Sequence, residues 1–307
     1  MSVREVQETH KKEGAAEQAS TPNPRYKNLP LELAIDWQYG TMINLSYPGL
    51  QLVHLSSITQ APIFIVNNFL SDDECDVLMA KTDTVALEPS NRVNKKSMKN
   101  DRTSWDVRVA KEETWGLQRR LATLTNHRVE NMEPVKIIKY TKGGFFLCHS
   151  DAGSKYNFLE KKIYQPSGAT QPVQPFDNRE ITVFIYLNNT DRGGETAFYN
   201  AKKSYGGGER AHEYLRLKPE KGMAAVFYAT YQPLSGNLPP QTSQVTQTMW
   251  HRRDGSLEAM AVDDMWHAGL EVFDEKYLLT QWIYPPNVDV DRSFGDYGAV
   301  RTDGRLI

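Results

Sequence analysis

Residues 135–151 read VKIIKYTKGGFFLCHSD, two strand-like runs joined by a glycine turn. The first run is rich in β-branched and aromatic residues, which are typical of strands. The second run ends in His149-Ser150-Asp151. Because successive side chains of a strand point to opposite faces, His149 and Asp151 are expected on the same face. Tyr140 precedes His149 by nine residues across Gly143-Gly144, which would let the two approach each other on paired strands.

Similar short runs fill much of the remaining chain and are separated by Gly, Pro or Asp/Asn clusters. They read ITVFIYL at 181–187, TAFY at 196–199, YLRL at 214–217, MAAVFY at 223–228 and LLTQWI at 278–283. Many short strands after two early helices indicate a mainly β fold, a sandwich or jelly roll backed by helices.

The two early helices are predicted over about 72–80 and over 112–126. Ser71 and Glu74 have the spacing of a capping box, which marks the start of the first helix. The second helix has an apolar face that is expected to pack on the core, and this face carries Trp115, Leu117, Leu121 and Leu124.

Composition divides the chain into three parts. Residues 1–25 have almost no large apolar side chain, so they cannot offset the entropy of being ordered and are predicted to form a disordered tail. Residues 26–60 are expected to pack as an extension on a single domain of residues 61–307. Long loops are predicted within that domain, and loops of such length are usually lids, binding loops or disordered inserts. They cover 152–178, 200–212 and 229–262.

The 307 residues have a globular composition, with 39% hydrophobic and 24% charged residues. Lys and Arg number 36 against 38 Asp and Glu, so the chain lacks the basic surplus that drives non-specific nucleic-acid binding. Cys75 and Cys148 have no zinc spacing and cannot form a disulfide framework. Cys148, next to His149, is expected to face the opposite side and to pack in the core. No run reaches about 18 apolar residues and the N-terminus is polar, so we expect a cytoplasmic or nuclear protein without membrane contact.

His149 and Asp151 on one face can hold two positions of a metal ion, and His267 is the best candidate for a third ligand. Two histidines and one carboxylate form the facial triad of non-haem Fe(II) sites, which leaves positions free for co-substrate and O₂. A lone His-x-Asp pair is more often an ordinary hydrogen-bonded pair, so the metal interpretation depends on its context. Lys276 lies nine residues after His267, and its ammonium could reach the same end of the jelly roll as the three candidate ligands.

Taken together, the motifs resemble those of one family. In chain order they are Tyr140-x-x-Gly143, His149-x-Asp151, Gly193-Gly194-Glu195-Thr196, His267-Ala268-Gly269, Lys276 and Trp282. They look like the catalytic domain of the prolyl 4-hydroxylase type of 2-oxoglutarate- and Fe(II)-dependent dioxygenases. The resemblance runs from about Ile63 to Pro285. It implies a double-stranded β-helix core of the jelly-roll or cupin-like kind, backed by helices.

The resemblance also implies a role for each motif residue. The two histidines and the aspartate of the triad bind Fe(II). Lys276 binds the distal carboxylate of 2-oxoglutarate through a charge-assisted bond, with help from Tyr140 and Thr182. Trp282 lines the iron pocket and is the candidate catalytic residue. O₂ is the second co-substrate, and ascorbate is the expected reductant.

The implied function is hydroxylation of a C–H bond coupled to decarboxylation of 2-oxoglutarate to succinate and CO₂. A prolyl residue in a protein or peptide is the expected target, and a free amino acid or other small molecule is the alternative substrate. A nucleic-acid demethylase of the same chemistry usually anchors the co-substrate through arginine, whereas this chain has Lys276. An inactive binding module of the same fold is the third alternative, and assays of Fe(II) binding and 2-oxoglutarate consumption would distinguish it.

Overall fold

The computed structural model describes most of the predicted domain and part of the extension before it. The described residues are 23–34, 43–56, 61–84, 87–90, 102–151, 156–157, 162–163, 179–200, 212–231, 249–251, 257–261, 265–284, 286 and 290.

The described helices are few and lie early in the chain. The α-helices are α2 (Asp72–Thr84) and α3 (Trp115–Thr125), and the short 3-10 helices are η1 (Leu31–Ala34), η2 (Lys111–Glu113) and η3 (Val129–Asn131). The strands are β1 (Leu50–Leu55), β2 (Pro62–Val66), β3 (Glu88–Pro89), β4 (Trp105–Val109), β5 (Val135–Tyr140), β6 (Phe146–His149), β7 (Tyr156–Asn157), β8 (Lys162–Ile163), β9 (Ile181–Tyr186), β10 (Thr196–Asn200), β11 (His212–Leu217), β12 (Ala224–Tyr228), β13 (Thr230–Tyr231), β14 (Met249–His251), β15 (Leu257–Ala261), β16 (Trp266–Gly269) and β17 (Lys276–Ile283).

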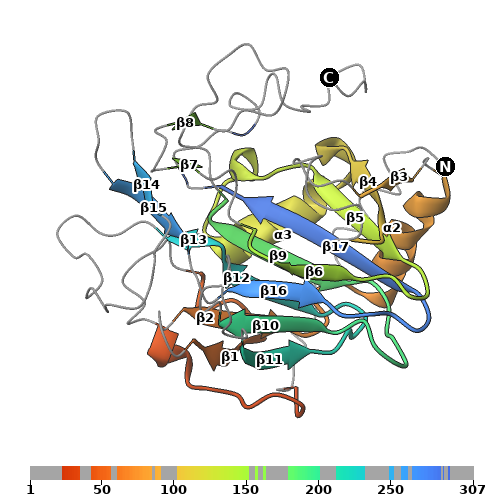
Figure 1. Cartoon of the computed structure of the whole chain (residues 1–307), viewed down its shortest axis with the longest axis horizontal. Helices are drawn as coiled ribbons and strands as arrows, with labels where there is room; N and C mark the ends of the chain where they lie inside the picture. Colours follow the sequence, from red (N-terminus) through yellow and green to blue (C-terminus); the bar gives the residue numbers. More distant parts are fainter. Residues whose placement is uncertain are drawn as a thin grey trace, which may run out of the picture.

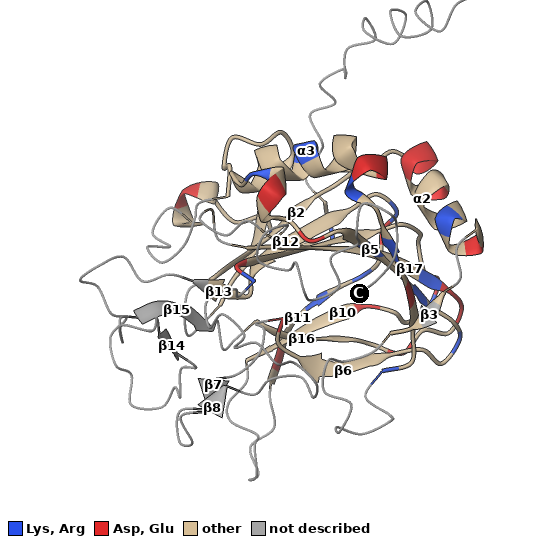
Figure 2. Cartoon of the chain, turned by 90° about the horizontal axis from the view of Figure 1, so that it is seen from above, with Lys and Arg blue, Asp and Glu red and all other residues tan. Residues whose placement is uncertain are grey.

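Two antiparallel sheets form the body of the molecule. The larger sheet has eight strands in the order β1-β2-β12-β9-β17-β5-β4-β3, and the smaller has four in the order β11-β10-β16-β6. Helices α2 and α3 cover one face of the larger sheet, and the smaller sheet lies against the other (Figure 1; Figure 2). The predicted mainly β fold, a jelly roll of the double-stranded β-helix kind backed by helices, is confirmed.

Aromatic side chains join the two sheets. Phe198 of β10 meets Phe227 of β12 edge to face, with ring centroids 5.1 Å apart, and Phe184 of β9 lies 5.3 Å from Phe227. All three are buried. Edge-to-face contacts of this kind stabilise a core beyond the area that they bury. They fix the separation of the sheets at the place where the functional residues face each other.

The early helices differ in extent from their predictions. The capping box of α2 is present, since Ser71 N donates to Glu74 Oε2 at 2.9 Å and Glu74 N donates to Ser71 Oγ at 3.2 Å. The helix continues to Thr84, four residues beyond the predicted end. The second predicted helix is divided into two. The 3-10 helix η2 ends at Glu113 and α3 begins at Trp115, so Thr114 lies between them.

Two packing expectations were wrong. Trp115 is 50% exposed, whereas Leu117, Leu121 and Leu124 are buried as predicted. Trp115 is the first residue of α3 and so lies at the end of the apolar face, away from the core. Cys148 faces away from the site as expected, but it is exposed to solvent rather than packed in the core.

The predicted long loops contain strands. Strands β7 and β8 lie within 152–178, and β13, β15 and β14 form a three-stranded sheet within 229–262. Residues 201–211 lie outside the described residues. Of the predicted tail, residues 1–22 also lie outside them, whereas Asn23 is buried and its amide donates to Glu220 Oε2 at 2.8 Å.

Among the described helices, none combines the length and the apolar character that crossing a membrane would require.

Candidate active site

The metal-binding candidates come from neighbouring strands of the smaller sheet. His149 ends β6 and is the direct cross-strand partner of His267 in β16. Asp151 follows β6 by two residues. Its two carboxylate oxygens each lie 3.6 Å from one imidazole Nε2, Oδ1 from that of His149 and Oδ2 from that of His267. The ligand atoms of all three lie within 4.8 Å of one another, so they can converge on one ion.

Both imidazoles are held by backbone carbonyls. The Nδ1 of His149 lies 2.8 Å from the carbonyl oxygen of Leu147, and the Nδ1 of His267 lies 3.1 Å from that of Met265. Because a carbonyl only accepts, each Nδ1 carries the hydrogen and donates it. In the neutral ring the Nε2 then carries the lone pair, and this is the atom that can bind a metal in metal-ligating histidines.

The donors fit an Fe(II) ion. The Nε2 of His267 is buried and has no hydrogen-bond partner among the described residues, and such an orphaned buried acceptor calls for a ligand. Burial raises the pKa of Asp151, but its electrostatic interactions with His267, His149 and Arg179 outweigh this effect and lower the pKa to about 2. The carboxylate is therefore ionised. A divalent cation bound at this position would also favour the ionised form of the Asp151 carboxylate.

Thr182 has a contact other than the predicted one. Its hydroxyl donates to Asp151 Oδ2 at 2.8 Å, at the metal end of the site. Thr182 is fully buried on β9 and lies opposite Trp282 of β17 in the larger sheet. A hydrogen bond of this kind orients a ligating carboxylate.

Lys276 lies at the other end of the pocket. It begins β17 directly opposite Tyr140 of β5, and it is 1% exposed. Its Nζ donates to the carbonyl oxygen of Gly194 at 2.6 Å and lies 5.5 Å and 5.3 Å from the rings of Tyr140 and Tyr186. Burial lowers the pKa of Lys276 to about 7, although the carboxylate of Glu195 acts in the opposite direction. A bound carboxylate would favour the ammonium form.

The glycines of the Gly193-Gly194 turn are required by its backbone. Their φ angles are +71° and +75°, which disfavour residues with a Cβ. A Cβ on Gly193 would lie 2.2 Å from the carbonyl oxygen of Glu271, and one on Gly194 would lie 3.3 Å from Cδ of Lys276. The turn therefore positions the Lys276 side chain.

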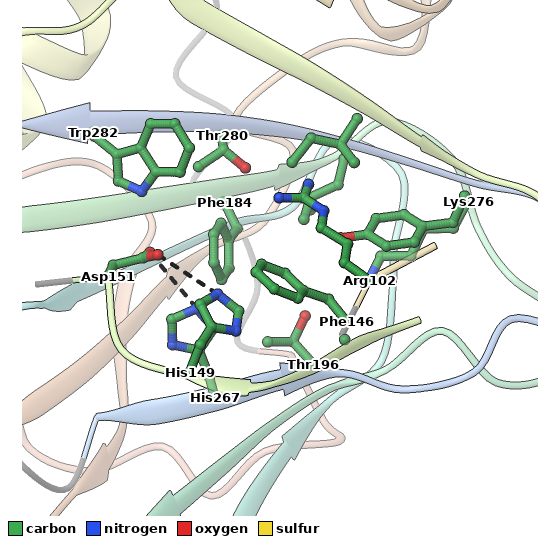
Figure 3. Close-up of a pocket in the computed structure, with 14 residues that line it drawn as sticks. Arg102, Phe146, His149, Asp151, Phe184, Thr196, His267, Lys276, Thr280 and Trp282 are labelled. Atoms are coloured by element: carbon green, nitrogen blue, oxygen red, sulfur yellow. Dashed lines mark ion pairs between the residues drawn. The ribbon is translucent and has the colours of Figure 1, made fainter. Parts of the chain in front are cut away.

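The three candidate metal ligands and Lys276 line the same pocket. Figure 3 shows the two histidines and Asp151 on one side, Lys276 on the other, and Phe146 and Arg102 between them. The ring of Phe146 stacks on that of His149 with centroids 3.6 Å apart. The Arg102 guanidinium lies 4.3 Å from the centroid of the Phe146 ring. Trp282 also lines the pocket.

Tyr140 and His149 do not lie on paired strands. Tyr140 is in β5 of the larger sheet and His149 is in β6 of the smaller sheet, so the two approach the pocket from opposite layers. The Gly143-Gly144 turn carries the chain from one sheet to the other instead of closing a hairpin.

Several lining residues received no role from the sequence, among them Arg102, Phe146 and Thr280. A role for Thr280 could have been predicted from the sequence. It lies four residues after Lys276 and two before Trp282, and residues an even number of positions apart lie on the same face of a strand. Phe146 lies three residues before His149, and only the bridge between Phe146 and Arg102 brings the arginine to the pocket.

Comparison with known proteins finds similarity to one family along this part of the chain. Residues 135–284 match the model of the 2OG-Fe(II) oxygenase superfamily. "Probable prolyl 4-hydroxylase 6" of Arabidopsis thaliana is 27% identical over 192 residues, covering 58% of this chain and 61% of that protein. "Prolyl 4-hydroxylase 2" of the same plant is 25% identical over 244 residues, covering 74% and 68%. The chain therefore spans about two thirds of the length of these relatives.

Among solved structures, the viral collagen prolyl hydroxylase of Paramecium Bursaria Chlorella virus-1, in complex with 2OG, superimposes with a TM-score of 0.43 at 20% identity, over 73% of this chain and 96% of that one. A Pseudomonas putida prolyl-4-hydroxylase gives 0.41 at 14% identity, over 72% and 92%. The matched family region begins at β5 and ends just after β17, so it contains both ends of the pocket. Residues 135–284 are thus similar to the 2OG-Fe(II) oxygenase superfamily, and the chain is similar in sequence to proteins named as prolyl 4-hydroxylases.

Proposed function

We propose that this protein is a 2-oxoglutarate-dependent dioxygenase that hydroxylates a prolyl residue of a protein or peptide. One observation carries the proposal. A buried triad of two histidines and one aspartate shares a pocket with a buried lysine. A metal site alone would suit many functions, whereas the combination suits a metal with a diacid co-substrate.

In this proposal His149, Asp151 and His267 hold Fe(II) through two Nε2 atoms and one carboxylate. The backbone carbonyls at 147 and 265 fix the imidazole orientations, and the hydroxyl of Thr182 fixes the carboxylate. Preorganised ligands need little movement when the ion enters.

Lys276 and Tyr140 bind the distal carboxylate of 2-oxoglutarate. Both are buried and lie opposite each other on β17 and β5, at the end of the pocket away from the triad. Fixing the far end of a flexible diacid sets its keto acid end against the triad, and positioning of this kind contributes to rate. We assign Lys276 the dominant part because its bond to a carboxylate is charge-assisted.

The wall of the pocket excludes water. The His267 ring lies 5.0 Å, 5.3 Å and 5.8 Å from the rings of Phe227, Phe184 and Phe198, and Trp282 closes the side next to Asp151 (Figure 3). When bound, Fe(II) with 2-oxoglutarate and O₂ supplies the oxidation, in which 2-oxoglutarate becomes succinate and CO₂ and a substrate C–H becomes C–OH. The apolar wall keeps that chemistry on the substrate.

The relatives named as prolyl 4-hydroxylases support proline as the target. A prolyl hydroxylase from Trichoplax adhaerens has been solved with a peptide fragment of a hypoxia inducible factor, which shows that such a fold accepts a peptide. We also propose ascorbate as the reductant and a cytoplasmic or nuclear location, in line with the sequence.

The test is succinate release with proline-containing peptides, free proline and other amino acids, followed by mass spectrometry of the product. We expect peptide-stimulated succinate formation and a mass gain of one oxygen on proline. His149→Ala, Asp151→Ala and His267→Ala should each abolish both signals. His212→Ala is the matched control, because His212 is exposed on β11, and it should leave both unchanged. Oxidation of free proline alone would contradict the peptide assignment, and turnover retained in any triad variant would contradict the site.

A further inference from the structure

A row of side chains leads out of the pocket across the larger sheet. Thr280 of β17 pairs with Phe184 of β9 on one side and with Lys136 of β5 on the other, and Lys136 pairs with Arg108 of β4. Directly paired residues in antiparallel strands present their side chains on the same face. Thr280 and Phe184 line the pocket, so Lys136 and Arg108 continue its floor toward solvent.

The outward part of this floor is cationic. Arg108 is exposed, and Lys136 forms an ion pair with Asp106 of β4 at 3.2 Å. Arg102 lines the pocket itself, and its charge interacts with that of Lys136. We call Arg102, Arg108, Lys136 and Asp106 the basic strip. It holds three positive charges and one negative, a local surplus of two in a chain whose net charge is −2.

Two polar groups in or next to the basic strip lack a hydrogen-bond partner among the described residues. The Nη2 of Arg102 is buried and lacks a hydrogen-bond partner there, while its Nε donates to Ser104 at 2.6 Å. The hydroxyl of Thr280 is also buried and without a partner among them. Leaving a buried donor on a cation unpaired is costly, so these groups favour an incoming acceptor.

We propose that the basic strip binds a carboxylate of the substrate, and that the substrate is an acidic peptide with Asp or Glu close to the hydroxylated proline. This inference rests on the function proposed above and names the substrate class for it. Adjacent strands lie about 4.8 Å apart, so Arg108 lies about 10 Å along the floor from Thr280. An extended peptide advances about 3.3 Å per residue, which places the acidic residue two or three positions from the proline.

Trp282 links the strip to the reaction. Its ring lies 5.5 Å from Nζ of Lys136, and it lines the pocket next to the triad (Figure 3). An acidic side chain held by Lys136 would therefore lie one strand away from the residue that borders the reacting proline. Asp106 opposes this binding, because it is the carboxylate that Lys136 already pairs with.

The test uses peptides of one sequence that differ at a single position, with Glu, Gln or Lys placed two or three residues from the proline. Binding of the labelled peptides to the full chain is measured by fluorescence anisotropy, and kcat/KM by hydroxyproline formation. We expect the Glu peptide to bind about tenfold tighter than the Gln peptide, and the Lys peptide to bind more weakly than either. The preference for Glu should shrink as salt is raised.

Variants assign the effect to the strip. Arg108→Gln and Lys136→Gln should each reduce the preference for Glu over Gln to about threefold or less, and Asp106→Asn should increase it. Lys139→Gln is the matched control, because Lys139 lies on the same strand as Lys136 but faces the other way, near Glu275 at 3.5 Å. It should keep the full preference.

Equal binding of the three peptides overturns the inference, and so does a preference for Glu that survives both Arg108→Gln and Lys136→Gln. If proline is hydroxylated with no preference for Glu, the strip assignment fails and the proposed function stands. If acidic peptides bind through the strip but no proline is hydroxylated, the proposed function fails and the strip assignment stands.

Discussion

Lys276 lies directly opposite Tyr140, and its buried ammonium donates to the carbonyl oxygen of Gly194 at the end of the pocket away from the triad. A buried lysine is unfavourable for folding unless it is paired, since removal of a charge from water costs free energy. Its presence beside a metal site is explained by a ligand that brings a negative charge. The buried lysine therefore lowers the stability of the ligand-free protein and raises its affinity for a negatively charged ligand.

Lys276→Met should separate these two effects. Because the pKa of Lys276 is lowered to about 7, the unfolded chain binds more protons than the folded chain from about pH 7 to about 10.5, and stability rises with pH across that window. Removing the amine should raise the Tm of the ligand-free protein by a few degrees at pH 6 to 7. It should also weaken 2-oxoglutarate binding by about 100-fold. Thermal unfolding and calorimetric titration with Mn(II) in place of Fe(II) measure the two effects. An unchanged affinity would exclude Lys276 from the site.

The affinity for 2-oxoglutarate should fall at alkaline pH. Below about pH 7 Lys276 is protonated in the free protein, and above this pH binding must take up a proton, so the Kd should rise by up to tenfold per pH unit. The groups that face it are Tyr140, Tyr186 and Glu195, and the carboxylate of Glu195 acts to keep the amine charged. Lys276→Arg should flatten this dependence, because arginine stays charged. A wild-type Kd as flat as that of the arginine variant would contradict the assignment.

Thr182→Val should weaken metal binding while the fold remains intact. The change keeps the shape of the side chain but removes the hydroxyl that donates to Asp151 Oδ2. Loss of such a supporting bond typically lowers metal affinity by 10- to 100-fold. Thr182→Ser keeps the hydroxyl and should bind Mn(II) nearly as well as the wild type. Equal affinities for the valine and serine variants would show that the hydrogen bond has no role.

Gly194→Ala should destabilise the protein and loosen the co-substrate site. Its φ of +75° is unfavourable for alanine, and the new Cβ would press on Lys276, so we expect a loss of about 1–2 kcal/mol and weaker 2-oxoglutarate binding. Gly116→Ala is the control, since Gly116 lies in α3 and, apart from its own helix backbone and chain neighbours, no described atom lies within 4 Å of the position of its Cβ. That change should stabilise the helix by about 0.5–1 kcal/mol. Urea unfolding measures both, and equal stability changes would refute the argument.

The strands and the pair of His149 and Asp151 were predictable because their signals are local. The pair shares a strand end, and the runs around Val135, Ile181 and Leu278 are long enough to show their character. His267 and Lys276 lie far from this pair in sequence, and they were only candidates until the motifs were taken together. The structure then brought them into one pocket.

Other features depended on tertiary contacts. The hydroxyl of Thr182 meets Asp151 only because β9 of one sheet faces β6 of the other, and no spacing in the sequence reports that distance. Arg102 reaches the pocket through its bridge to Phe146, which joins segments that are separate in the sequence. The register that aligns Lys136 with Thr280 was equally invisible, because a change of one residue in strand pairing would place that lysine on the other face.

Anaerobic titration of the purified protein with Fe(II) and then 2-oxoglutarate, followed by visible absorption, tests the central claim most directly. We predict one Fe(II) per chain and a new absorption band on adding 2-oxoglutarate. The band should be lost in His149→Ala, Asp151→Ala and His267→Ala, and should need far more 2-oxoglutarate in Lys276→Met. A wild-type protein that gives no band, or a band that persists in any of the three triad variants, would contradict the account.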